Sequence, residues 1–211
     1  MLQTAFTFYG AAVSWLELTG FILALANVIC SVRESHWAWP LAIVSSALYV
    51  WLFYVSKLYG ESGVNLFFVA SAVWGWWQWL FGHRRGSQAP LAPVRMHGHM
   101  VLQIAVASWI FLWIAVSMIL SKTTDTDVAW ADGFVTSGSV IGTVLLARKY
   151  IENWPVWLVV NAASITLFVY KSLWLTALLY AILFGLSAWG WRVWHVRLAL
   201  FNGAPPLEST P

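Results

Sequence analysis

Charged residues are scarce in this chain of 211 residues. Asp, Glu, Lys and Arg together make up 9% of the sequence and hydrophobic residues 61%, whereas a typical soluble domain carries roughly 25% charged residues. The mean hydropathy is +0.74. So few charges leave too little polar surface for a water-soluble protein. The long apolar segments instead predict a multi-pass membrane protein.

Several functional classes lack their characteristic residues. Cys30 is the single cysteine, which excludes an intrachain disulfide and a cysteine-rich metal site. The adjacent histidines His97 and His99 have no partner at metal-ligand spacing on another span. No GxxxxGK[ST] motif and no nucleophile–base constellation occurs. We therefore predict no enzyme, no cofactor and no bound metal. The basic residues are spread over loops, which gives no indication of nucleic-acid binding.

Apolar segments are the dominant feature of what is present. Since a membrane-spanning helix needs about 20 apolar residues, we predict an all-α membrane protein with seven transmembrane helices. Their predicted ranges are 13–31, 37–55, 63–81, 100–120, 131–147, 154–171 and 173–192.

The distribution of basic residues predicts the orientation. If the N-terminus is outside, the outer side receives only Lys57, Lys122 and Lys171 of the eleven basic residues. The inner side receives the other eight, which are Arg33, Arg84, Arg85, Arg95, Arg148, Lys149, Arg192 and Arg197. The positive-inside rule therefore favours an N-terminus on the outer side and a C-terminus on the inner side of the membrane.

The sequence matches itself at a shift of 115 residues. Trp39-Pro40 then aligns with Trp154-Pro155, and the phrase WGW at 74–76 aligns with WGW at 189–191. Each copy is a three-helix unit, and one helix is left over between them. Two parallel repeats of this kind are a transporter design with the substrate site between them, near the middle of the membrane. Duplication also occurs in channels and receptors, so the repeat favours transport only moderately.

The repeat sets the predicted domain organisation. We expect a first three-helix bundle at 1–82, an inner loop plus linking fourth helix at 83–127, and a second bundle at 128–197. The segment 198–211 ends in a polar, proline-rich stretch, which predicts a disordered cytoplasmic tail.

Polar residues deep in the predicted helices are the candidates for substrate binding. Asn161 lies near the middle of its helix, with Trp157 four residues earlier on the same face. An amide beside an indole suits a flat, polar and cationic ring. An alternative is that such amides only hydrogen-bond neighbouring helices, as Asn27 would in the inner part of the first helix. Ionisable groups are nearly absent at this depth, which favours passive transport, although Glu17 and Asp132 leave ion coupling open.

The predicted site combines these polar residues with the deeper tryptophans. It is lined by Trp51, Asn65, Trp74, Trp157, Asn161, Tyr180 and Trp189, with Gln78 at the inner mouth. We assign Trp39, Trp154 and Trp194 to the aromatic belt at the inner surface. Trp109 and Trp113 share a face of the fourth helix, and we expect them to contact lipid or another subunit. Gly75 and Gly190 are small positions that would allow close approach of helices.

The order of these stretches resembles the PnuC family of bacterial vitamin transporters. The resemblance rests on WPLAIVSSALYVWLFYVSKLYGE at 39–61, NLFFVASAVWGWWQW at 65–79, the segment from ARKYIENWPVW to LLYAILF at 147–184, and WGWRVW at 189–194. It extends from about Trp15 to Trp194. In many family members we expect a tyrosine where this chain has Phe68, and Asp or Asn at the position of Asn161.

The resemblance implies a SWEET-like 3+1+3 fold and facilitated diffusion of nicotinamide riboside, which a cytoplasmic kinase then traps by phosphorylation. It also implies a homotrimer in the lipid bilayer. Thiamine and then riboflavin are the alternative substrates, and a vitamin-binding subunit of a motor-driven importer is an alternative class. A retinal protein is disfavoured, because the last helix has no lysine between Trp174 and Trp191.

Overall fold

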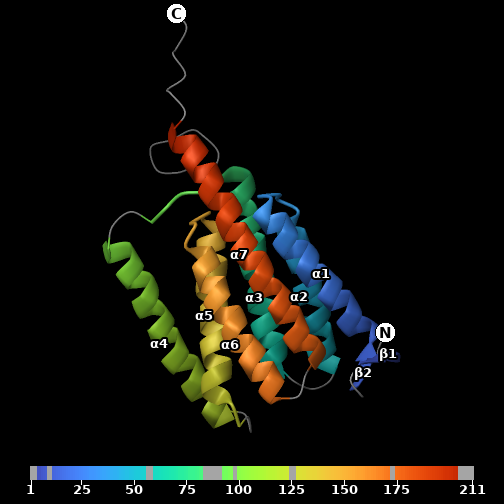
Figure 1. Ribbon diagram of the computed structural model, residues 1–211. Helices are drawn as coiled ribbons and strands as arrows, with labels where there is room; N and C mark the ends of the chain where they lie inside the picture. The colour runs from blue at the N-terminus through green and yellow to red at the C-terminus, as the bar shows by residue number, and fades with distance from the viewer. Residues whose placement is uncertain are drawn as a thin grey trace, which may run out of the picture.

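The computed structural model describes residues 4–8, 11–55, 59–82, 92–96, 99–123, 127–171 and 174–203. These residues form a two-stranded hairpin followed by seven helices (Figure 1). The elements are β1 (Thr4–Phe8), β2 (Ala11–Ser14), α1 (Trp15–Val32), α2 (Ala38–Val55), α3 (Tyr59–Phe81), α4 (His99–Thr123), α5 (Ala129–Ala147), α6 (Asn153–Tyr170) and α7 (Trp174–Gly203).

The described residues form seven helices at the places in the sequence where the seven spans are predicted. Four helical stretches are long and apolar enough to cross a membrane, and these are Leu102–Thr123, Ala129–Ala147, Asn153–Tyr170 and Trp174–Leu200. Leu18–Val32 and Ala38–Trp51 are shorter apolar helices. Helix α7 continues to Gly203 and so includes residues 198–203, which the sequence analysis placed in the tail. Residues 204–211 lie outside the described part of the chain.

The hairpin before α1 is absent from the sequence analysis. Strands β1 and β2 pair antiparallel, with Phe6 opposite Val13 and Phe8 opposite Ala11. The sequence TAFTF is rich in threonine and phenylalanine, which favour strands. The structure therefore adds a small β element to a fold that is otherwise helical.

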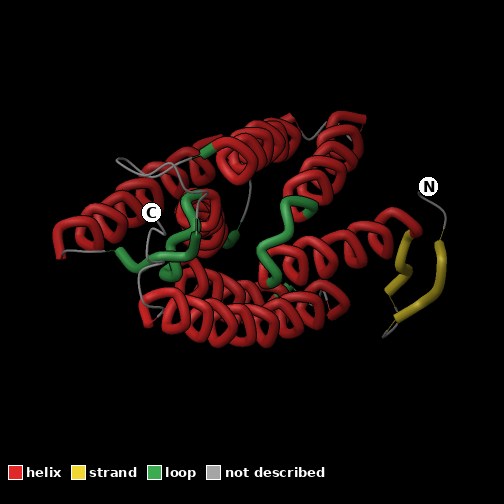
Figure 2. Tube along the Cα trace, turned by 90° about the horizontal axis from the view of Figure 1, so that it is seen from above, coloured by secondary structure: helices red, strands yellow, loops and turns green. Residues whose placement is uncertain are grey.

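Helices of the two repeats contact each other in equivalent ways. Within the first repeat α2 packs on α1 and α3, and within the second α6 packs on α5 and α7. Between the repeats, α1 lies beside α7 and α3 beside α5. Figure 2, which looks down on the molecule from above, shows the helices grouped around a common centre. The first helix of each repeat thus contacts the last helix of the other.

Helix α4 packs along α5 at the side of the other helices (Figure 1). Trp109 stacks on Phe134 with 5.1 Å between ring centroids, and its indole N–H donates to the carbonyl of Phe134 at 3.3 Å. The indole N–H of Trp113 donates to the carbonyl of Trp130 at 2.8 Å. Both indoles therefore pack on α5, which offers them aromatic partners and carbonyl acceptors, and their contact with lipid or another subunit stays a prediction.

The segment before α4 is also attached to the second repeat. The backbone of Val94 accepts a hydrogen bond from Ile151 N–H at 2.9 Å and donates one to the carbonyl of Lys149 at 3.0 Å. The carboxylate of Glu152 accepts from Met96 N–H at 3.1 Å. These bonds connect residues 92–96 to the turn between α5 and α6. Helix α4 and its connection therefore lie with the second repeat at both ends.

The tryptophan–glycine pattern of the sequence forms the same packing motif twice. The ring of Trp39 covers Gly75 and that of Trp154 covers Gly190, so closely that a Cβ on either glycine would overlap the indole. Trp79 meets Trp39 edge to face at 5.5 Å and 87°. The repeat-equivalent pair, Trp194 on Trp154, has 5.4 Å and 88°. The close approach predicted for the two glycines is thereby confirmed.

The assignment of Trp39, Trp154 and Trp194 to a surface belt is wrong. Trp39 is 3% exposed, Trp154 2% and Trp194 0%. Each lies in a hydrophobic cluster where the two repeats meet. Depth along the helix alone suggested a belt, but an indole near a helix end is buried when it faces a glycine of the neighbouring helix.

Candidate substrate cavity

A cavity of about 300 Å³ lies between the two repeats. Its lining comes from all six repeat helices and contains eight repeat-equivalent pairs. These are Ala24/Ser139, Val28/Thr143, Ser31/Leu146, Trp39/Trp154, Ala42/Trp157, Ser46/Asn161, Phe68/Leu183 and Ala72/Ser187. The cavity therefore lies on the axis that relates the two copies. Its size is at the lower end for small-molecule sites.

The two repeats contribute different chemistry to this cavity. Ser139 and Thr143 of α5 stand where α1 has Ala24 and Val28, and Ser187 of α7 stands where α3 has Ala72. Among the described residues, the lining contains indoles, hydroxyls and amides, but no Asp, Glu, Lys, Arg or His. Such a site is suited to hydrogen-bonding and stacking a flat ligand, and it offers no charged partner.

Among the predicted site residues that line the cavity, Asn161 is the most buried. It is 2% exposed, and its Nδ2 donates to Ser187 Oγ at 3.1 Å. The Ser187 hydroxyl in turn donates to the carbonyl of Leu183 at 2.8 Å. Because Ser187 uses its hydrogen on Leu183, it acts as the acceptor for Asn161. The amide orientation is thus set by a chain of two hydrogen bonds.

Trp157 reaches the cavity because the facing helix has a glycine. A Cβ on Gly142 would lie 2.9 Å from the Trp157 ring, so any larger residue there would displace the indole. Tyr180 completes this part of the wall, with its ring stacked on Phe168 at 5.2 Å and 20°. Three residues of the predicted site, Trp157, Asn161 and Tyr180, are therefore brought together in one cavity.

The other predicted site residues do not line this cavity. Trp51 is 67% exposed and Trp189 is 42% exposed on the outside of the helices. Trp74 is half-buried, with the guanidinium of Arg148 6.0 Å from its ring centroid. Asn65 and Gln78 are half-buried on α3. The predicted site selects tryptophans by their position along each predicted span. The direction in which a side chain points depends instead on how the helices pack.

The structure adds lining residues that the predicted site omitted. Trp39 and Trp154 form part of the wall, as do Asn27, Ser31 and Ser187. Asn27 is a deep polar residue in the sequence, but the predicted site does not include it. The signal for the two tryptophans was their repeat-equivalent spacing to Gly75 and Gly190, which indicates an indole buried against a glycine.

Beyond the cavity, one end of the bundle is charged. This charged end consists of Arg33, Glu34, Arg148, Lys149 and Arg197, at the top in Figure 1, where α7 ends. Ser31 and Leu146 line the cavity in the last turns of α1 and α5, and the charged turns follow directly.

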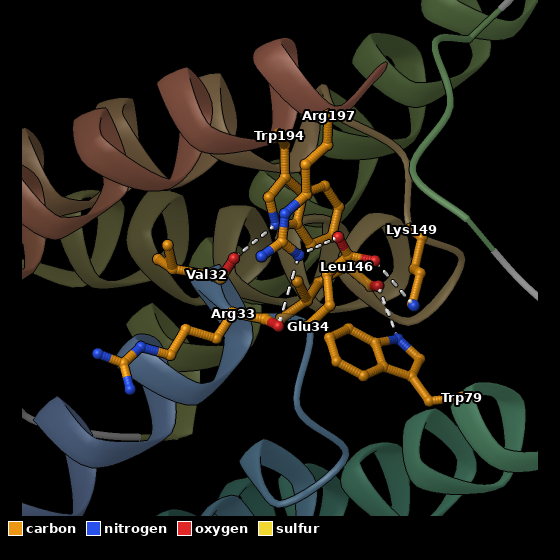
Figure 3. Close-up of polar contacts among 8 residues, drawn as sticks. All are labelled: Val32, Arg33, Glu34, Trp79, Leu146, Lys149, Trp194 and Arg197. Atoms are coloured by element: carbon orange, nitrogen blue, oxygen red, sulfur yellow. Dashed lines mark hydrogen bonds and ion pairs between the residues drawn. The ribbon is translucent and has the colours of Figure 1, made fainter. Parts of the chain in front are cut away.

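Glu34 connects the two repeats at the charged end (Figure 3). Its carboxylate accepts a hydrogen bond from Lys149 Nζ at 3.0 Å and one from Arg197 at 2.5 Å. Glu34 and Lys149 occupy equivalent positions, 115 residues apart. Their side chains are largely buried, with 14% and 10% exposure. An ion pair therefore lies across the axis between the repeats.

Backbone geometry places these two side chains. Glu34 and Lys149 have φ of 57° and 52°, in the left-handed region. In both turns the N–H of this residue and of the next donate back into the last helical turn, to Ser31 and Cys30 in one copy and to Leu146 and Leu145 in the other. These are Schellman motifs, in which glycine is the usual residue at the left-handed position. Any residue with a Cβ costs about 1–2 kcal/mol at this position, so a non-glycine residue in both copies indicates a role for its side chain.

Two indoles strengthen the contact between the repeats at this end (Figure 3). Trp79 Nε1–H donates to the carbonyl of Leu146 at 3.2 Å, and Trp194 Nε1–H donates to the carbonyl of Val32 at 3.1 Å. Lys149 Nζ lies 4.7 Å from the centroid of the Trp79 ring. Hydrogen bonds, an ion pair and a cation–π contact thus close the charged end.

Comparison with known proteins assigns the family. Residues 14–196 match the family described as nicotinamide mononucleotide transporter. The riboflavin/roseoflavin transporter RibM of Streptomyces davaonensis is 26% identical, over 98% of this chain and 96% of RibM. The nicotinamide riboside transporter PnuC of Escherichia coli is 22% identical, over 88% of this chain and 87% of that protein.

A solved structure shares the fold. The crystal structure of the vitamin B3 transporter PnuC superposes with a TM-score of 0.69 at 21% identity, covering 88% of this chain and 83% of that chain. The protein is therefore a multi-pass membrane transporter and not an enzyme, and the chain belongs to the nicotinamide mononucleotide transporter family, with PnuC among its members.

Proposed function

We propose that the protein is a uniporter that carries nicotinamide riboside across the bacterial inner membrane by facilitated diffusion. The observation behind this proposal is the cavity between the repeats, where Trp157 and Asn161 lie together and the described lining residues include no charged side chain. An indole can stack on the cationic pyridine ring. Hydroxyls and amides of the wall suit the carboxamide and the ribose. Phosphorylation by a cytoplasmic kinase then traps the product.

The helix contacts support a 3+1+3 arrangement with two parallel three-helix bundles and α4 as the linking helix. Contacts of α1 with α7 and of α3 with α5 are the ones that parallel repeats around a common axis would form. The positive-inside rule makes the charged end cytoplasmic, and it places the N-terminus in the periplasm.

Transport by alternating access requires the repeats to separate at one end while they close at the other. Glu34, Lys149 and Arg197 join the repeats at the charged end, so they act as a latch that holds the cytoplasmic side shut. Release of the latch opens the cavity to the cytoplasm. Of the residues predicted from the sequence, Trp74 and Gln78 remain predictions for the inner part of the path. Trp51, Asn65 and Trp189 remain predictions for conformations in which other faces of the helices line it.

Riboflavin is a second candidate substrate. RibM matches this chain almost from end to end, over 98% of it. A neutral flavin is also compatible with a cavity whose described lining residues offer no carboxylate to a cation. Both ligands have a flat ring and several hydroxyls, so the same wall would suit either.

Uptake into liposomes tests the proposal directly. The purified protein, reconstituted without ATP or a partner subunit, should equilibrate labelled nicotinamide riboside across the bilayer, and excess unlabelled riboside should compete. Competition by riboflavin or thiamine would identify the alternative substrates. Lack of uptake of all three vitamins would refute the uniporter proposal and favour a binding subunit that needs a separate motor.

A further inference from the structure

The cavity contains two asparagines that each lie beside a serine, with Asn161 donating to Ser187 and Asn27 accepting from Ser31. We propose that these amides read an amide-type group on the substrate, with an N–H donor beside an acceptor, and that Asn27 is the residue that donates to this acceptor. This inference rests on the proposed function, because it assigns a ligand group to the same cavity. It makes Asn27 a specificity-determining residue.

Asn161 presents an acceptor to the cavity. Its Nδ2 is used on Ser187 at 3.1 Å, and Ser187 acts as acceptor because its own hydrogen goes to Leu183. Oδ1 of Asn161 receives no hydrogen bond from the part of the chain that the structure describes. Because Asn161 lines the cavity, this oxygen is available to accept a hydrogen bond from a ligand N–H.

Asn27 presents donors. The Ser31 hydroxyl shares its hydrogen between two acceptors of this residue, the backbone carbonyl at 3.0 Å and Oδ1 at 3.3 Å, so Oδ1 points toward Ser31. Across the described ranges, no acceptor is found for Nδ2 of this half-buried side chain. An asparagine amide has two N–H donors on this nitrogen. Because Asn27 lines the cavity, these donors are available to a bound molecule.

A difference between the repeats at two equivalent positions explains why an amide is found at position 27. In the second repeat Trp157 of α6 fills the space over Gly142 of α5. The equivalent positions in the first repeat are Ala42 and Asn27, both in the cavity wall. There the small alanine leaves room that the asparagine takes. One copy therefore gives the site a stacking surface, and the other gives it a pair of donors.

A donor on one wall and an acceptor on the other select a ligand with the complementary pair. A primary carboxamide has a carbonyl and an N–H on the same carbon, and the pyrimidine edge of a flavin has a carbonyl beside an N–H. A carboxylate has acceptors only, so it would leave Oδ1 of Asn161 facing a negative oxygen. The site should reject the acid analogue of its substrate for this reason.

Binding titrations with matched ligands test the inference. Nicotinamide riboside has both groups, whereas 3-acetylpyridine riboside keeps the carbonyl and lacks the N–H. On wild-type protein the acetyl analogue should bind about tenfold more weakly. Asn27→Ala should weaken both ligands about tenfold, because both have the carbonyl. Asn161→Ala should weaken only nicotinamide riboside. Thr19→Ala, an exposed change on the same helix as Asn27, is the control and should leave both affinities unchanged.

Each outcome decides the inference. Equal binding of the two ribosides to wild-type protein, or an Asn27→Ala affinity equal to that of Thr19→Ala, would overturn it. The wild-type comparison holds even where a variant fails to fold. If the protein binds riboflavin and not nicotinamide riboside, riboflavin and N3-methylriboflavin form the equivalent pair, with the same expected pattern. Binding of none of these ligands would instead overturn the proposed function.

Discussion

Glu34→Gln should make it easier for the two repeats to separate at the charged end of the protein. The substitution keeps the size and the hydrogen-bonding capacity of the side chain but leaves Lys149 and Arg197 without their carboxylate. An exposed ion pair contributes about 0–1 kcal/mol, and removing one partner of a buried pair costs about 3–5 kcal/mol. With 14% and 10% exposure of Glu34 and Lys149, the pair lies between these limits. We expect the closed state to lose about 2 kcal/mol.

This loss converts into a population shift. The contact exists only where the repeats meet, so a state in which they have separated at this end is not affected by its removal. Since about 1.36 kcal/mol corresponds to a factor of ten, the ratio of open to closed molecules should rise about 30-fold. In a protein that is mostly closed, the accessibility of the cavity from the charged end should rise by the same factor.

The single cysteine of the chain makes this accessibility measurable. In a Cys30→Ser background, Thr143→Cys places one thiol in the cavity wall. The rate of labelling by a membrane-impermeant maleimide is then measured in inverted and in right-side-out vesicles. Glu34→Gln should raise the rate in inverted vesicles, which expose the cytoplasmic side.

Asp127→Asn is the matched control for this measurement. It removes an ion pair with Lys171 between the turn before α5 and the end of α6. The hydrogen bond from Lys171 holds the pKa of Asp127 below its usual range, so the control pair is charged at neutral pH. A Glu34→Gln rate equal to that of Asp127→Asn, in protein with an unchanged elution profile, would refute the latch. A rise in right-side-out vesicles instead would keep the latch and reverse the orientation.

Two further substitutions test the cavity and the packing between helices. Asn161→Leu should lower nicotinamide riboside uptake and binding but leave the thermal unfolding midpoint close to that of wild type, and unchanged uptake would show that Asn161 does not bind the substrate. Gly190→Ala should lower the unfolding midpoint, because a Cβ there overlaps the Trp154 ring and overpacking costs about 1–3 kcal/mol. Gly185→Ala on the same helix, where a Cβ meets nothing within 4 Å, should not lower it, and equal midpoints for the two variants would contradict the packing argument.

Helix number and the internal repeat could be predicted from the sequence because both depend on local composition. Each span is apolar over its own length, and a duplication remains visible when Trp-Gly-Trp recurs in register. Trp157 and Asn161 could be paired because residues four apart share a helix face. These features require no knowledge of which helices meet.

Whether an individual side chain points into the cavity or to the outer surface could not be predicted in this way. Trp51 and Trp189 were expected in the site, yet they are exposed, while Trp39 and Trp154 were expected at the surface, yet they line the cavity. The difference depends on contacts between helices, such as the indole of Trp39 on Gly75. The ion pair of Glu34 and Lys149 likewise depends on two turns far apart in the sequence that meet at the axis.

The two copies are identical at residues that pack helices together and differ at residues that would contact the ligand. Trp39/Trp154 and Gly75/Gly190 are identical, because both repeats need the same close contact between helices. A flat vitamin has no twofold symmetry, so a symmetric wall would duplicate some contacts and omit others.

Apart from Trp39/Trp154, the repeat-equivalent pairs of the cavity accordingly differ, as Ala42 and Trp157 do. The same reasoning applies at the charged end. Two like charges at the equivalent positions 34 and 149 would repel across the axis, whereas glutamate in one copy and lysine in the other attract. Identity within the packing contacts and difference at the axis are thus what a duplicated carrier of an asymmetric ligand requires.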